Sequence, residues 1–179
     1  MGVHFTLFDT SVGACALAWG AHGLTGVLLP EASEAATRVR AQRRHAGASE
    51  AEPTAGIARV IERIRGLLAG GSDDLADITL DLRAIPPFNR RVYAIARAIR
   101  PGSTRSYGEI ATLLGEPHAA RAVGQALGAN PFPIIVPCHR VLAAGAKAGG
   151  FSAPGGTRTK LRLLEIERAL LGGSPGLFD

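Results

Sequence analysis

The segment that most constrains the fold runs from Asn130 to Val141 and reads NPFPIIVPCHRV. Its three prolines bias the residues before them towards extended backbone, so this segment is not a helix. Between the prolines, the β-branched run Ile134-Ile135-Val136 predicts a short, buried, strand-like segment. The segment therefore holds one thiol, that of Cys138, on a rigid and mostly apolar support.

The residues that follow this thiol suggest chemistry. His139 and Arg140 come directly after Cys138, and an imidazole and a guanidinium beside a thiol favour the nucleophilic thiolate. The alternative is a buried structural thiol, which is what most free cysteines are. Adjacency in sequence does not bring side chains together, so the local residues leave both interpretations open.

Length and targeting signals set broad limits. A chain of 179 residues can form one large domain or two small ones, with a real hydrophobic core. No apolar run approaches the roughly 20 residues that span a bilayer, and no secretory signal is visible at the N-terminus. Cys15 and Cys138 could form a disulfide, but a reducing cytosol fits better because a disulfide would consume the nucleophile. We therefore expect a cytoplasmic protein without a membrane partner.

Charge is distributed unevenly along the chain. Residues 1–83 carry 8 Lys+Arg against 10 Asp+Glu, whereas residues 84–179 carry 12 against 5, a net charge of +7. The basic half also contains Cys138, and this asymmetry suggests a polyanionic partner such as nucleic acid. An arginine-rich composition without any such partner is the alternative, and charge alone does not decide between the two.

The first half of the chain predicts an antiparallel sheet with helices packed against it. Short alternating or apolar runs separated by turn residues indicate strands, and apolar residues at helical spacing indicate helices. The expected strands cover residues 3–9, 14–19, 24–29 and 78–82, and the expected helices cover residues 31–44 and 56–68, with a loop over 46–53. Four residues here could be imagined as metal ligands, namely His4, Cys15, His22 and His45. Their spacing matches no zinc signature, so we expect no metal site and no cofactor.

The second half predicts a mostly helical domain. The segment 83–87 (RAIPP) reads as a linker, which divides the chain into residues 1–83 and 84–179. Ser106 and Glu109 form a capping-box pattern, which predicts the start of a helix. The expected helices cover residues 88–99, 106–114, 118–128 and 157–171, and a Gly/Ala-rich loop covers 143–156. The second and third of these helices, joined by a tight turn, are a helix-turn-helix candidate.

The helix expected over residues 118–128 has little side-chain bulk. It reads HAARAVGQALG, whereas a helix that reads the major groove normally carries Asn, Gln or several Arg. A slim helix indicates close backbone approach, as in a narrow minor groove. Tight packing within the protein is the alternative, and the helix alone favours it.

Three motifs together resemble one known family. SYGEIA, AARAVGQAL and NPFPIIVPCHRV occur in the same order and nearly the same spacing as in the O6-alkylguanine-DNA alkyltransferases. The resemblance implies an α/β (α+β) fold, with an RNase H-like N-terminal sheet domain and a winged-helix-like helix-turn-helix in the C-terminal domain. It also implies a monomer that binds double-stranded DNA in the minor groove, extrudes O6-alkylguanine and transfers the alkyl group irreversibly to Cys138. Extrusion is required because O6 of guanine cannot be attacked inside the base stack.

The resemblance also assigns roles to individual residues. It implies that Arg121 fills the gap left by the extruded base, on a helix whose Ala120 and Gly124 approach the DNA. Tyr107 matches the tyrosine that contacts the flipped guanine and aids rotation of a phosphate. Asn130, Val141, Phe151 and Ser152 are expected to form the substrate pocket. Phe151 stands where many members have Tyr, so a hydroxyl contact to the lesion is missing here.

The resemblance further implies a proton relay through His139 and a glutamate near the C-terminus. Glu167 matches this glutamate, and Glu165 is the fallback, expected to face solvent. Two other functions remain open on the residues alone. One is a cysteine hydrolase or thiol-redox enzyme, although the chain has no C-x-x-C pair. The other is a binding-only recogniser of DNA damage in which Cys138 is unused.

Overall fold

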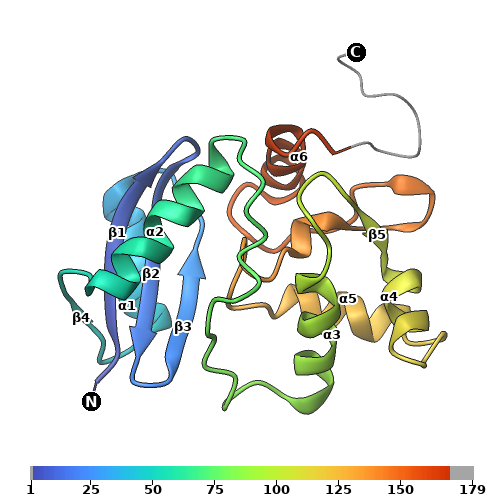
Figure 1. Ribbon diagram of the computed structural model, residues 1–179, viewed down its shortest axis with the longest axis horizontal. Helices are drawn as coiled ribbons and strands as arrows, with labels where there is room; N and C mark the ends of the chain where they lie inside the picture. The colour runs from blue at the N-terminus through green and yellow to red at the C-terminus, as the bar shows by residue number, and fades with distance from the viewer. Residues whose placement is uncertain (1, 170–179) are drawn as a thin grey trace.

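The computed structural model describes residues 2–169, and its first half is built on a four-stranded sheet (Figure 1). Three of the expected strands are confirmed as an antiparallel meander, namely β1 (His4–Thr10), β2 (Gly13–Gly20) and β3 (Gly23–Leu28). A fourth strand, β4 (Ser49–Glu50), pairs parallel to β1 and completes the order β3-β2-β1-β4. The sequence analysis expected a loop there, because two exposed residues carry no alternating pattern.

Two helices cover the two faces of this sheet. Figure 1 shows α2 (Ala55–Leu68) in front of the strands and α1 (Glu34–Arg44) behind them. Successive side chains of β2 point to opposite faces of the sheet, which explains this arrangement. Leu17 and Trp19 belong to the same core cluster as the apolar face of α2. Ala16 and Ala18, on the opposite face, pack with Ala41 of α1. The helix expected from residue 31 begins at Glu34, because Ser33 caps it by accepting the Ala36 N–H at 3.1 Å.

The strand expected over residues 78–82 is wrong. Only Leu80 forms a bridge, with Leu24, in the parallel sense. The alternation of Ile78, Leu80 and Leu82 arises because these side chains pack against the core, and no continuous ladder forms beside β3. This segment is an irregular stretch that leads from α2 into the second half.

The second half is mostly helical, as expected. Its helices are α3 (Pro87–Arg97), α4 (Tyr107–Leu113), α5 (Ala120–Gly128) and α6 (Gly156–Ile166). The capping box is confirmed, because Ser106 Oγ accepts the Glu109 N–H at 3.0 Å and Glu109 accepts the Ser106 N–H at 2.6 Å. The final helix ends at Ile166 and not at 171, and positions 170 and 171 of that prediction lie outside the described residues.

A two-stranded parallel ladder in this half has no clear signature in the sequence. It joins β5 (Arg105–Ser106) to β6 (Val141–Leu142). β5 directly precedes α4, and β6 directly follows a 3₁₀ turn, η1 (Cys138–Arg140). The loop after β6 contains a second such turn, η2 (Ala144–Ala146), with Gly145 at φ 75°. The ladder thus ties the start of α4 to the residues that follow Cys138.

The segment expected to be strand-like, Ile134–Val136, is a buried turn. Ile134 has φ 76°, a left-handed conformation that ends any extended run. All three side chains are at most 2% exposed, so the prediction of burial is confirmed and the prediction of strand geometry is wrong. Asn130 supplies part of the hydrogen bonding that a ladder would have supplied, donating from Nδ2 to the Val136 carbonyl at 2.9 Å. We call residues 130–137 the active-site turn.

The largest hydrophobic cluster contains residues from both halves of the chain. It includes Leu17 and Ile64 from the sheet and α2, and Val123 and Val136 from the helical half. A backbone hydrogen bond from the Val27 N–H to the Pro131 carbonyl, at 2.9 Å, joins β3 to the active-site turn. Between residues 2 and 169, no helix is long and apolar enough to cross a bilayer.

Candidate active site

Cys138 lies at the start of η1, where the active-site turn ends. Its side chain is 9% exposed, and its N–H donates to the Val136 carbonyl at 2.8 Å. Burial raises the pKa of this thiol, while a hydrogen bond with Asn130 and the charge of Lys160 act in the opposite direction. The thiol therefore needs a base to form its thiolate at neutral pH. Both cysteines are free.

His139 and Glu167 form the predicted pair. The His139 Nε2–H donates to Glu167 Oε1 at 2.9 Å, and the two side chains are 1% and 4% exposed. This bond leaves Nδ1 as the basic nitrogen of a neutral imidazole. Nδ1 is buried and has no hydrogen-bond partner in the described chain. Glu165, the fallback for the relay, is exposed as expected.

The electrostatics of the pair keep His139 neutral and Glu167 ionised. Burial lowers the pKa of His139, and the bond to Glu167 opposes this shift without reversing it. Burial alone raises the pKa of Glu167, but hydrogen bonds from His139 and Arg140 outweigh it and lower that pKa to about 2. A neutral imidazole with a free Nδ1 can accept a proton at pH 7.

The sequence analysis expected the Arg140 guanidinium to favour the thiolate, whereas in the structure its hydrogen bonds go to Glu167 and the Ile99 carbonyl. It donates to Glu167 from Nε at 2.9 Å and from Nη2 at 2.7 Å, and from Nη1 to the Ile99 carbonyl at 2.6 Å. Its side chain is 1% exposed, so its charge is neutralised inside the protein. The adjacency of Arg140 to Cys138 was visible in the sequence, but its partners come from residues far along the chain.

Lys160 was also missed as a site residue. It is fully buried on α6, donates to the Val141 carbonyl at 2.6 Å, and lies 5.7 Å from the centre of the Tyr107 ring. Burial lowers its pKa to about 8, and the neighbouring Cys138 opposes that shift. Burial, together with Cys138, raises the pKa of Tyr107, so its hydroxyl keeps its proton. A buried cation thus lies between Tyr107 and the residues that follow the thiol.

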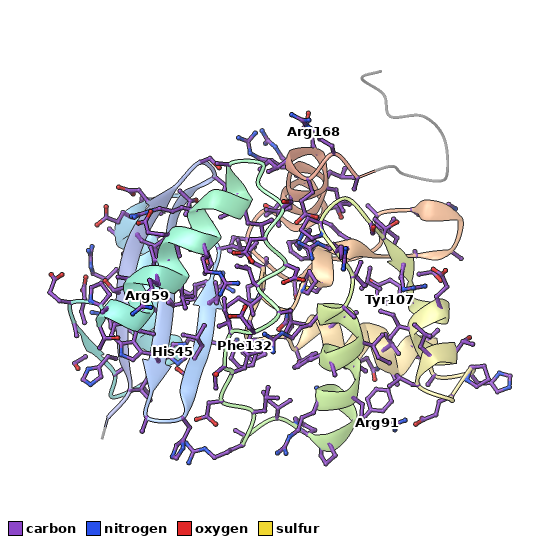
Figure 2. The ribbon with its side chains drawn as sticks, viewed as in Figure 1. His45, Arg59, Arg91, Tyr107, Phe132 and Arg168 are labelled. Carbon is purple, nitrogen blue, oxygen red and sulfur yellow. The ribbon has the colours of Figure 1, made fainter. Side chains whose placement is uncertain are left out.

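A cavity of about 630 Å³ brings most of the predicted DNA-facing and pocket residues together with Cys138. We call it the helix-side cavity, because α5 forms one wall. Besides Cys138, the predicted residues that line it are Tyr107, Ala120, Arg121, Gly124, Phe151 and Ser152. Figure 2 shows Tyr107 well into the helical half, and Phe132 of the active-site turn closer to the sheet. The Ser152 hydroxyl donates to the Gly128 carbonyl at 2.9 Å, which fixes the loop against α5.

A second, smaller cavity of about 150 Å³ lies on the other side of the thiol. We call it the sheet-side cavity, because residues of β3 and the end of α1 line it together with the active-site turn. Cys138, Phe151 and Ser152 line both cavities, and Asn130 lines only the sheet-side one. Val141 lines neither: its side chain is fully buried, and its carbonyl accepts the Lys160 bond.

Of the four residues considered as metal ligands, two have evident structural roles. Cys15 is buried in the core, and burial raises its pKa to about 12. His4 Nδ1 lies 2.9 Å from Ser49 Oγ. Among residues 2–169, no three His, Cys, Asp or Glu side chains come together as metal ligands.

The fold and the site define a class of protein in which a buried thiol lines a cavity beside a slim helix and directly precedes the histidine of a buried His–Glu pair. The family model described as "6-O-methylguanine DNA methyltransferase, DNA binding domain" matches residues 87–169. A methylated-DNA–protein-cysteine methyltransferase of Mycobacterium tuberculosis is 36% identical over 177 residues, covering 99% of each chain. One of Methanothermobacter thermautotrophicus is 33% identical over 155 residues, covering 87% of this chain and 80% of that protein. The chain belongs to the methylated-DNA–protein-cysteine methyltransferase family.

Solved structures agree with this assignment. The crystal structure of M. tuberculosis OGT in complex with DNA matches with a TM-score of 0.74 and 36% identity, covering 92% of each chain. The O6-methylguanine-DNA methyltransferase of Pyrococcus kodakaraensis matches with a TM-score of 0.68 and 26% identity, covering 91% of this chain and 98% of that one. The likeness extends over both halves of the molecule and includes the N-terminal sheet.

Proposed function

We propose that this protein repairs DNA by transferring an alkyl group from O6 of guanine to Cys138. The observation that carries the proposal is the position of the thiol, which lines the cavity beside α5 and directly precedes the His139–Glu167 pair. Membership of the family supports the reaction. Glu167 lies far from Cys138 in sequence, so its hydrogen bond to His139, the residue next to the thiol, supports a shared role.

In the proposed reaction, His139 Nδ1 takes the proton of Cys138 through a bridging water, and Glu167 stabilises the imidazolium that forms. The thiolate then attacks the alkyl carbon in line with the C–O6 bond. A sulfur–carbon bond forms, the carbon–O6 bond breaks, and its electron pair leaves with guanine. The thioether is stable, so each molecule acts once.

The leaving guanine gains negative charge and needs a donor. We assign this role to the Tyr107 hydroxyl, which lines the same cavity as Cys138. Lys160, 5.7 Å from the Tyr107 ring, supplies positive charge on the side where the guanine anion develops. Phe151 offers a flat apolar face for the base and no hydroxyl.

DNA binding is assigned to α4 and α5 as a helix-turn-helix within a winged-helix-like domain. α5 presents Ala120 and Gly124 to the helix-side cavity, and such a slim surface suits the narrow minor groove. Arg121 would occupy the gap left in the stack when the alkylated guanine is flipped into the cavity. The wider organisation in this proposal is an RNase H-like domain over residues 1–83 and a DNA-binding, alkyl-accepting domain over 84–179. The protein is proposed to act as a cytoplasmic monomer.

Intact-protein mass spectrometry after incubation with a duplex carrying one O6-methylguanine tests the function. We expect the mass of one methylene to be gained on Cys138 and no gain in Cys138→Ala. Cys15→Ala is the matched control and should gain the same mass, because the pKa of Cys15 is about 12 and its thiol is buried in the core. Tight binding of the damaged duplex without any gain in mass would instead favour a damage recogniser.

A further inference from the structure

α5 carries two long polar side chains at the helix-side cavity, those of Arg121 and Gln125. The other residues of this helix are small or apolar, and Val123, Ala126 and Leu127 are buried. Arg121 and Gln125 are four residues apart, so they lie on the same side of the helix, about 5–6 Å from each other. The proposed function assigns a role to Arg121 and leaves Gln125 without one.

Gln125 lies at the mouth of this cavity and not on its floor. Arg121 and Gln125 are exposed, whereas Ala120 and Gly124 are partly buried. Gly124 faces Tyr107, because a Cβ at this glycine would lie 3.8 Å from the Tyr107 ring. A base flipped into the cavity therefore meets Tyr107 and Gly124, while Gln125 faces the duplex that the base has left.

The carboxamide of Gln125 is free to bind a partner outside the protein. It takes part in no side-chain hydrogen bond within residues 2–169. A carboxamide has an acceptor oxygen and a donor nitrogen, so it can bind two complementary groups side by side. If DNA covered this carboxamide without supplying partners, the loss of its water would cost free energy.

The position of Arg121 indicates which part of the duplex Gln125 faces. With Arg121 in the gap of the base stack, a side chain about 5–6 Å away reaches a base pair that borders the gap, since successive pairs are about 3.4 Å apart. In the minor groove every base pair presents acceptors, and only G·C adds a donor, the 2-amino group of guanine. Gln125 Oε1 can accept from this amino group while Nε2 donates to an acceptor beside it.

We propose that Gln125 sets the sequence context in which the lesion is repaired fastest, by accepting a hydrogen bond from a guanine 2-amino group in a base pair that borders the gap. The favoured substrates are duplexes in which the alkylated guanine has a G·C neighbour. The inference rests on the proposed function and adds to it a preference for the surrounding sequence.

The test measures the single-turnover rate constant of methyl transfer, below saturation, from duplexes in which one pair beside O6-methylguanine is varied, on the 5′ side or on the 3′ side. G·C is compared with inosine·C, and 2-aminoadenine·T with A·T, because each comparison changes only the minor-groove amino group. We expect the amino group to speed the wild type about fivefold on one of the two sides, the effect of one hydrogen bond between neutral groups. The amino group also strengthens the pair and so hinders base flipping, which by itself predicts the opposite order.

Gln125→Met keeps the length of the side chain and removes both of its hydrogen-bonding groups. The advantage given by the amino group should disappear in this variant. Because the advantage is a ratio of two rates of one protein sample, partial unfolding of the variant does not change it. Gln42→Met is the matched control: Gln42 is exposed on α1 and does not line the helix-side cavity, so this variant should keep the advantage.

Two results would overturn the inference. One is a wild type that reacts equally fast with and without the amino group on both sides of the lesion. The other is an advantage that persists in Gln125→Met. A wild type that transfers methyl from none of the duplexes would contradict the proposed function itself.

Discussion

Glu167 is the residue that joins His139 and Arg140 in one buried cluster. Its carboxylate accepts from His139 and twice from Arg140, all inside the protein. The resemblance to known alkyltransferases was sufficient to select Glu167 over Glu165 from sequence. It could not reveal the bonds of Arg140, nor the position of Lys160, because both depend on which distant carbonyl groups the fold brings to a buried cation.

Glu167→Gln should abolish efficient transfer and destabilise the protein. The substitution leaves Arg140 buried without a counter-ion, and breaking a buried ion pair in this way costs about 3–5 kcal/mol. The free energy of unfolding in urea, together with the single-turnover rate, measures both effects. Glu165→Gln changes an exposed carboxylate on the same helix and should alter neither. A Glu167 variant with wild-type stability would contradict the role of this cluster.

The same cluster predicts how stability depends on pH. The pKa of Glu167 is about 2 in the folded protein against an ordinary 4.5, so the unfolded state binds more protons between these values. The stabilisation is complete above pH 4.5 and is lost as the pH falls towards 2, by about 3 kcal/mol in total. His139 acts in the same direction below its ordinary pKa of 6.5, because burial lowers its pKa. The free energy of unfolding in urea should fall more steeply between pH 7 and pH 3 for the wild type than for Glu167→Gln.

At the scale of elements, the sequence was informative where local rules decide the structure. The periodicity of Ile57, Ile61, Ile64 and Leu68 gave α2, and the capping box gave the start of α4. The strands β4, β5 and β6 were not predicted, because each is two residues long and depends on hydrogen bonds to a partner far away in sequence. The run Ile134–Val136 has β-branched residues for a strand, yet Asn130 closes it into a turn.

Ser106→Ala tests the element that carries Tyr107. Loss of the capping bond to the Glu109 N–H should reduce the free energy of unfolding by about 1 kcal/mol. We also expect slower alkyl transfer, since Tyr107 is the first residue of α4. Ser103→Ala, at an exposed position in the preceding turn, should change neither quantity. Chemical denaturation of the two variants and the wild type measures the free energy of unfolding, and single-turnover kinetics measures the rate of alkyl transfer.

At the scale of the whole molecule, the charge asymmetry and the continuous core were only partly predictable. The net charge of +7 over residues 84–179 was evident from the sequence and agrees with a DNA-binding half. The packing of the sheet against the active-site turn was not, because it depends on contacts such as that between Val27 and Pro131. For the same reason the sheet-side cavity could not have been foreseen, since α1 lies about 90 residues before the thiol it approaches.

Arg121→Ala tests whether this side chain acts within the DNA stack. The variant should transfer alkyl groups from duplex DNA at least about tenfold more slowly, because replacing lost stacking is worth a few kcal/mol. Transfer from a single-stranded oligonucleotide with the same lesion should be nearly unchanged, since it leaves no gap to fill. Arg162→Ala removes an equal charge from the exposed face of α6 and serves as the control. Equal slowing on both DNA forms would assign Arg121 to phosphate binding alone.

The short ladder between β5 and β6 fixes the positions of Tyr107 and the thiol's turn relative to each other in the DNA-free protein. Arg105 and Ser106 pair with Val141 and Leu142, so the strand entering Tyr107 and the strand leaving the thiol's turn are bonded directly to each other. The Tyr107 hydroxyl and the Cys138 thiol, to which we assign the donor and acceptor roles, are therefore held at a spacing that the protein sets without the nucleic acid. A modified guanine presented as a free base should consequently still react, more slowly for want of a duplex to hold it in place.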